Sequence, residues 1–139
     1  MKRVNVLLWV VQGLLAALFL FAGGMKLIVP IEALTMPVPL PGGFLRFIGV
    51  AEVLGAVGLM LPDLLKIHRE LTPLAAGGLV IIMIGATFIT ALGGSIAPAF
   101  VPFIVGVLAA SVAFARWPHA RATAAAVRDS RLTLRFSIR

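Results

Sequence analysis

The stretch FLRFIGVAEVLGAVGLMLP, residues 44–62, decides the fold class because it is almost continuously apolar and long enough to cross a membrane. A bilayer core requires about 20 predominantly apolar residues in one helix. Three further segments have a similar length and character. The sequence therefore predicts an all-α fold, an integral membrane four-helix bundle with spans at residues 4–27, 44–61, 72–92 and 98–115.

The composition also indicates a membrane protein. Of the 139 residues, 61% are hydrophobic and only 12% are charged, whereas a soluble domain carries about 25% charged residues. The net charge of +7 does not indicate nucleic-acid binding, because six of the twelve basic residues lie from Arg116 onward. Basic residues at the flanks of apolar runs set the orientation of a membrane protein. We expect the lipid bilayer as a partner and no nucleic acid.

The loops differ in charge. Ten basic residues lie in the N-terminus, the 62–71 loop and the C-terminal segment from Arg116 onward, and none lies in the 28–43 or 93–97 loop. The positive-inside bias places both termini in the cytoplasm, as in a multi-pass protein of the bacterial inner (plasma) membrane. The first apolar run exceeds the 7–15 residues of a signal-peptide core, so it is expected to remain as a span.

A basic cytoplasmic tail, residues 118–139, is expected to follow a four-span domain at residues 1–117. The alanine-rich 120–126 segment favours a helix, whereas RLTLRFSIR at residues 131–139 alternates at period two and suits a strand. The tail either serves as a solvated orienting segment or binds anionic lipid or an acidic partner surface.

A charged residue, Glu52, interrupts the second span. At 100° per residue, Gly49, Gly55 and Ala56 flank it within about 60°, which places it on a close-packed helix interface. It lies about 12 Å from the outer boundary, near the middle of the bilayer, and Thr87 reaches a similar depth. An unpaired carboxylate is costly to bury. We therefore expect Glu52 either to have a polar or charged partner or to serve a function.

Two interpretations of Glu52 stay open. It either locks helix register, neutral or paired with Lys26 and hydrogen-bonded to Thr87 or Gln12, or it exchanges a proton or binds a polar head group. Exposure to lipid in a locally thinned membrane is a third arrangement. Arg46 lies on another face of the same helix and is expected to extend to the outer head groups.

The residues limit cofactor chemistry in this chain. There is no cysteine, which excludes thiolate nucleophiles and iron–sulfur ligation. The two histidines, His68 and His119, lie outside the apolar runs. We expect no metal site and no cofactor held by this chain alone.

Three motifs resemble the DoxX-like family of small four-helix membrane proteins: FLFAGGMKL ending the first span, GVAEVLGAVGLMLP in the second and LTPLAAGGLVIIMIGA opening the third. The resemblance covers roughly residues 10–117, and Arg116–Trp117 resembles the family's ending. It places the family's lysine at Lys26 and its glutamate at Glu52. Related sequences often carry a histidine where this chain has Thr90, so any chemistry of that histidine is missing here.

The resemblance implies a role but no substrate. The superfamily takes its name from a membrane subunit of thiosulfate:quinone oxidoreductase. By this likeness the chain is expected to be an accessory subunit of a redox or oxidative-stress complex, whose electron-transfer cofactor comes from a membrane or peripheral redox partner. A quinone or lipid pocket would be bounded by Lys26 and Glu52 and extended by Gln12, Thr87 and Thr90. In it Glu52 would relay a proton and Lys26 would hold the anion.

Alternatives remain at this point. Other relatives are described as assembly chaperones, so a non-enzymatic assembly or scaffolding protein is the second interpretation, and whether the chain belongs to an enzyme stays open. A homo-oligomer is compatible with the small-residue faces. A small-solute transporter is disfavoured because four short helices show no inverted repeat.

Overall fold

The computed structural model describes residues 2–34, 38–68, 70–94 and 96–137. Within these residues the chain forms four α-helices and one short 3-10 helix: α1 (Lys2–Ile28), η1 (Ile31–Ala33), α2 (Gly42–Leu65), α3 (Leu71–Leu92) and α4 (Ile96–Ser137). All four α-helices contain a segment long and apolar enough to cross a membrane. The predicted integral membrane four-helix bundle is confirmed.

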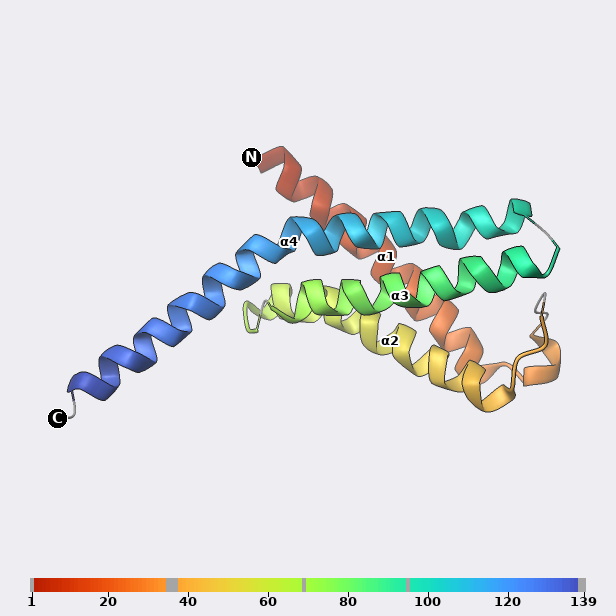
Figure 1. Cartoon of the computed structure of the whole chain (residues 1–139), viewed down its shortest axis with the longest axis horizontal. Helices are drawn as coiled ribbons and strands as arrows, with labels where there is room; N and C mark the ends of the chain where they lie inside the picture. The colour runs from red at the N-terminus through yellow and green to blue at the C-terminus, as the bar shows by residue number, and fades with distance from the viewer. Residues whose placement is uncertain (1, 35–37, 69, 95, 138–139) are drawn as a thin grey trace.

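The helices associate as two pairs. α1 packs mainly against α2, α3 packs mainly against α4, and α2 and α3 join the pairs. Figure 1 shows both chain termini and the α2–α3 turn at one end of the bundle, with the α1–α2 and α3–α4 connections at the other. The arrangement therefore brings together the chain segments in which the sequence concentrates basic residues.

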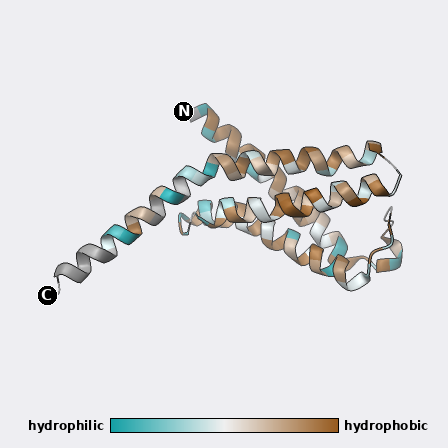
Figure 2. Ribbon diagram, in the orientation of Figure 1, coloured by the Kyte–Doolittle hydropathy of each residue, from teal (hydrophilic) through white to brown (hydrophobic). Residues whose placement is uncertain are grey.

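The core contains side chains from every long helix. Phe19, Leu59, Leu79 and Val112 are almost completely buried. Large apolar side chains also point outward, such as Phe114, which is 82% exposed. An outward apolar surface suits a protein surrounded by lipid, where small residues and polar groups mediate contacts between helices. Figure 2 shows hydrophobic residues along the bundle and hydrophilic ones on α4 beyond it.

Two glycines let α1 and α2 approach closely. A Cβ atom added to Gly23 would lie 2.7 Å from the carbonyl oxygen of Gly49, and one added to Gly49 would lie 3.0 Å from the carbonyl oxygen of Gly23. Both obstacles are backbone atoms, which cannot rotate away. Glycine at these two positions therefore sets the distance between the helices that carry Lys26 and Glu52.

Replacing Gly23 with Ala is expected to lower the free energy of unfolding by about 1–3 kcal/mol, because the added methyl group forces the two backbones apart. The matched control is Gly24→Ala, where a Cβ would meet nothing within 4 Å and helix propensity favours alanine. Denaturant titration in detergent micelles measures both. Equal stability of the two variants would show that the close approach does not constrain the bundle.

Two helix ends differ from the prediction. α2 continues through Pro62 to Leu65, so Asp63 lies in the helix and not in a 62–71 loop. Proline is tolerated in membrane helices because neighbouring groups can satisfy the freed carbonyl. α4 continues through the tail to Ser137, and the predicted strand is wrong for residues 131–137. A helix satisfies its backbone internally, whereas a lone strand has no ladder partner. Residues 138–139 lie outside the described part.

Candidate functional site

An ion pair lies inside the bundle between α1 and α2. The Nζ atom of Lys26 is 2.8 Å from Oε2 and 3.1 Å from Oε1 of Glu52. The glutamate side chain is 3% exposed and the lysine side chain 20% exposed. Of the partners considered for Glu52, the structure therefore selects Lys26, whose ammonium group donates to both carboxylate oxygens.

The end of α1 also accepts a hydrogen bond from the second basic residue of this region, Arg46. Arg46 donates from its guanidinium group to the carbonyl oxygen of Lys26. This contact adds a protein partner that the sequence did not suggest, and the extension of Arg46 to the outer head groups stays a prediction. The physical reason for the contact is that the last four carbonyl groups of a helix lack intrahelical donors, and Lys26 lies in the last turn of α1. Arg46 thus holds the backbone that carries Lys26.

A second polar cluster lies at the end of the bundle that contains the chain termini. In this Arg116 cluster (Gln12, Asp63 and Arg116), the arginine Nε atom is 3.3 Å from Asp63 Oδ2. Arg116 donates to Gln12 Oε1 at 2.9 Å from Nε and 2.6 Å from Nη2. Its guanidinium group lies 5.7 Å from the Trp9 ring centroid. The cluster therefore connects α1, α2 and α4.

Gln12 uses all of its polar atoms within this cluster. Its Nε2 donates to the carbonyl oxygen of Leu59 at 2.8 Å and to Asp63 Oδ2 at 3.3 Å, and its side chain is fully buried. At 1.5 Å per residue, Gln12 and Lys26 are about 21 Å apart along α1. The predicted hydrogen bond between Gln12 and Glu52 is therefore wrong.

Sequence reasoning missed Asp63 and Arg116 as partners, although a spacing signal exists. Glu52 and Asp63 are eleven positions apart on α2, which leaves them about 20° apart around the helix. Gln12 and Lys26 are fourteen positions apart on α1, again on one face. Each of these two adjacent helices thus carries two polar residues on one face, separated by a similar number of positions. This pattern indicates one polar contact at each end of the interface between the helices.

Thr87 and Thr90, the two threonines of α3 that were predicted to line a site, do not join either cluster. Thr87 Oγ1 donates to the carbonyl oxygen of Met83 at 2.7 Å, and Thr90 Oγ1 donates to that of Ala86 at 2.7 Å. Each hydroxyl hydrogen is thus used within its own helix. The predicted hydrogen bond from Thr87 to Glu52 is wrong, and Thr90 lies one turn beyond Thr87 on α3.

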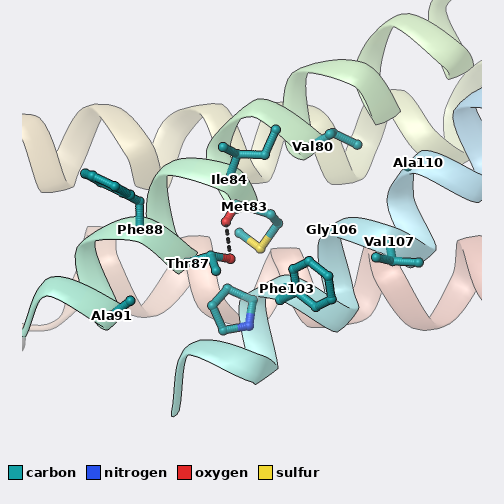
Figure 3. Close-up of a pocket in the computed structure, with 11 residues that line it drawn as sticks. Val80, Met83, Ile84, Thr87, Phe88, Ala91, Phe103, Gly106, Val107 and Ala110 are labelled. Atoms are coloured by element: carbon teal, nitrogen blue, oxygen red, sulfur yellow. Dashed lines mark hydrogen bonds between the residues drawn. The ribbon is translucent and has the colours of Figure 1, made fainter. Parts of the chain in front are cut away.

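An apolar pocket lies elsewhere, between α3 and α4 (Figure 3), and its volume is about 470 Å³. Of the predicted binding residues, Thr87 lines it, and Lys26, Glu52, Gln12 and Thr90 do not. The pocket is therefore separate from the ion pair. Its lining consists of Val80, Met83, Ile84, Thr87, Phe88, Ala91, Pro102, Phe103, Gly106, Val107 and Ala110.

The two polar clusters determine which chemistry this part of the chain supports. One pairs a carboxylate with an ammonium group, and the other pairs a carboxylate with a guanidinium group. Among the described residues, no three His, Cys, Asp or Glu side chains are grouped so that they could hold a metal ion. The arrangement can hold a proton or fix helices, and Glu52 is the carboxylate nearer to mid-membrane.

Comparison with known proteins identifies the family. The model of the DoxX-like family matches residues 10–113, well over half of the chain. No curated protein and no solved structure was found to match. The matched region includes Gln12, Lys26, Glu52 and Asp63. The chain therefore belongs to the DoxX-like family, and it is a multi-pass membrane protein.

Proposed function

We propose that this protein is an accessory membrane subunit of a redox or oxidative-stress complex, in which the Lys26–Glu52 pair exchanges a proton. The observation that supports the proposal is the 3% exposure of the Glu52 side chain, within hydrogen-bonding distance of Lys26 inside the bundle. Ionisable residues within membrane spans are costly and mark proton relays or ligand pathways. The redox assignment rests on the family resemblance.

The geometry supports proton access to Glu52 from the side of Lys26. Glu52 is shielded by α1 and α2, whereas Lys26 is partly accessible at 20% exposure. When Glu52 accepts a proton, its carboxyl group becomes neutral and the ion pair is lost, while Lys26 keeps its charge and can turn outward. Proton uptake would therefore loosen the contact between α1 and α2 beside Gly23 and Gly49.

The α3–α4 pocket supports a ligand chain better than a polar head group. Among the described residues that line it, only Thr87 has a polar side chain, and its hydroxyl hydrogen is already donated to the carbonyl oxygen of Met83. In this proposal the pocket holds the apolar chain of a quinone or a lipid. In this proposal any metal-based electron carrier belongs to a redox partner, because the chain contains no cysteine and its two histidines lie outside the candidate membrane spans.

Replacing Glu52 with Gln tests the proton step, because the amide keeps the shape and removes the titratable group. The variant is expected to fold and insert, and the quinone-linked activity of the complex is expected to fall by about 10²-fold or more, as for loss of a general acid–base group. The matched control is Glu32→Gln, at an exposed glutamate in η1. Full activity of Glu52→Gln across the pH range would contradict proton exchange.

A specific feature of α3 supports a second candidate, a non-enzymatic assembly or scaffolding protein. A Cβ atom added to Gly77, Gly78 or Gly85 would meet nothing within 4 Å. Such uncovered glycines allow the backbone of another transmembrane helix to approach closely. In this role the Lys26–Glu52 pair is a structural lock.

Native purification separates the two candidates. If the redox proposal is correct, we expect a redox protein to co-purify and a quinone to be detected by mass spectrometry of the detergent extract. If the protein is a scaffold, we expect a stably bound membrane protein and no quinone. The Glu52→Gln variant should then bind the same partner. Retention of the partner by Glu52→Gln together with loss of quinone-linked activity would favour the redox role.

A further inference from the structure

The last part of α4, residues 118–137, extends beyond the bundle (Figure 1). All side chains described between Arg121 and Ser130 are exposed, including Val127 at 49%. A segment that served only to orient the chain would need positive charge but no particular helical face. The register of this helix shows such a face.

The basic positions of the tail helix fall on one side. At 100° per residue, positions 121, 128, 131 and 135 lie within about 80° of one another. The large apolar positions flank this arc on both sides: they are 127 and 134 on one side, and 132 and 136 on the other. The helix thus combines arginines and large apolar residues on one broad face.

The opposite side is small and polar. An arc of about 120°, centred opposite the arginines, contains the only acidic residue of the tail and all of its hydroxyl residues. The positions in this arc are 122, 123, 126, 129, 130, 133 and 137, of which 122 and 126 are alanines. Separation of a basic, apolar face from a small polar face is the pattern of a helix that lies in the membrane interface.

Trp117 indicates where this face lies relative to the membrane. The membrane-spanning part of α4 ends at Pro118, and tryptophan is typical of the membrane–water interface. The guanidinium group of Arg121 lies 5.6 Å from the Trp117 ring centroid, so the arginine face begins at the membrane surface. Pro118 lies inside the helix, and because proline is a usual cause of a bend, a turn of the tail toward that surface would occur there.

We propose that residues 118–137 form an interfacial helix whose arginine face binds the phosphate groups of anionic lipids. Charge complementarity supports this occupant, because guanidinium groups bind phosphate oxygens in a forked geometry. The flanking apolar residues would enter the boundary between head groups and acyl chains. The tail would then anchor the bundle in lipid of a particular charge, a property independent of proton exchange at Glu52.

Single-cysteine labelling of the full chain tests the proposal directly, because the sequence contains no cysteine. Leu132→Cys places an environment-sensitive fluorophore beside the arginine face, and Ser130→Cys places it on the opposite face. In nanodiscs with anionic lipid we expect blue-shifted emission at position 132 only. The shift should be absent in purely zwitterionic nanodiscs and lost at 1 M salt, where the Debye length is about 3 Å. Equal emission at both positions, or in both lipids, would overturn the proposal.

A charge-swapped variant tests whether the face matters or only the charge. The paired changes Arg128→Ser with Ser130→Arg, and Arg135→Ser with Ser137→Arg, move two charges to the opposite face and leave the net charge at +7. We expect the emission shift at position 132 to be lost. A retained shift would show that charge alone suffices. A shift that appears only when an acidic protein is added to zwitterionic nanodiscs would assign the face to a protein partner, and either result overturns the proposal.

Discussion

Replacing Lys26 with Met is expected to lower the free energy of unfolding by about 3–5 kcal/mol, because it leaves the carboxylate of Glu52 buried without its cation. The glutamate side chain is only 3% exposed and its cation lies 2.8 Å away, so bulk water has little access to the carboxylate and solvates it poorly when the ammonium group is removed. Unfolding by denaturant in detergent micelles measures the loss. The methionine side chain is similar in length, so packing changes little.

Two further variants separate the charge effect from packing. Lys66→Met makes the same change at an exposed lysine and is expected to have little effect. The double variant Lys26→Met with Glu52→Leu removes both charges and is expected to recover most of the stability, because apolar residues often replace a buried ion pair without loss. If Lys26→Met is as stable as Lys66→Met, the pair does not stabilise the bundle.

The double variant also distinguishes the two roles of Glu52. If Glu52 only locks the two helices together, apolar packing can replace the ion pair. We then expect the double variant to be stable and to function normally. If Glu52 exchanges a proton, an apolar residue cannot take over that role. We then expect the double variant to be stable but to lack quinone-linked activity. Stability and activity therefore report different properties of the same two residues.

The four spans were predictable because hydropathy determines them directly. Segments 4–27 and 72–92 agree with α1 and α3 to within about two residues, the usual uncertainty of helix ends. The Lys26–Glu52 contact was also among the predicted arrangements, since glycines on both helices bring their backbones together and buried charges require partners. Local pattern and elementary electrostatics were sufficient here.

The Arg116 cluster was not predicted, because each of its charges has a simpler local explanation. Pro62 suggests that the helix ends before Asp63, and Arg116 follows an apolar run where basic residues set orientation. Recognising the pair requires knowing that α4 passes beside α1 and α2 at that end, which no local pattern specifies. The inward contact of Arg46 was missed for the same reason, since its acceptor is a backbone carbonyl of another helix.

Replacing Arg116 with Met is expected to cost about 3–5 kcal/mol of unfolding free energy, because Asp63 then remains buried with only the amide of Gln12 as a polar partner. The side chains of Arg116 and Asp63 are 11% and 8% exposed, respectively. The matched control is Arg121→Met, at an exposed arginine that also lies over a tryptophan ring. Comparable stability of the two variants would contradict a structural role for the cluster.

Arg116→Lys shows whether charge or geometry holds α4 in place. Arg116 donates from two nitrogen atoms to Gln12 while its Nε atom contacts Asp63, and a lysine ammonium group lacks that planar fork. We therefore expect stability between that of the native protein and Arg116→Met. Because α4 contacts α1 much less than it contacts α3, the loss should appear first as separation of α4 from α1, measurable by spin labels on both helices. Full stability in Arg116→Lys would mean that the positive charge alone holds the helices together.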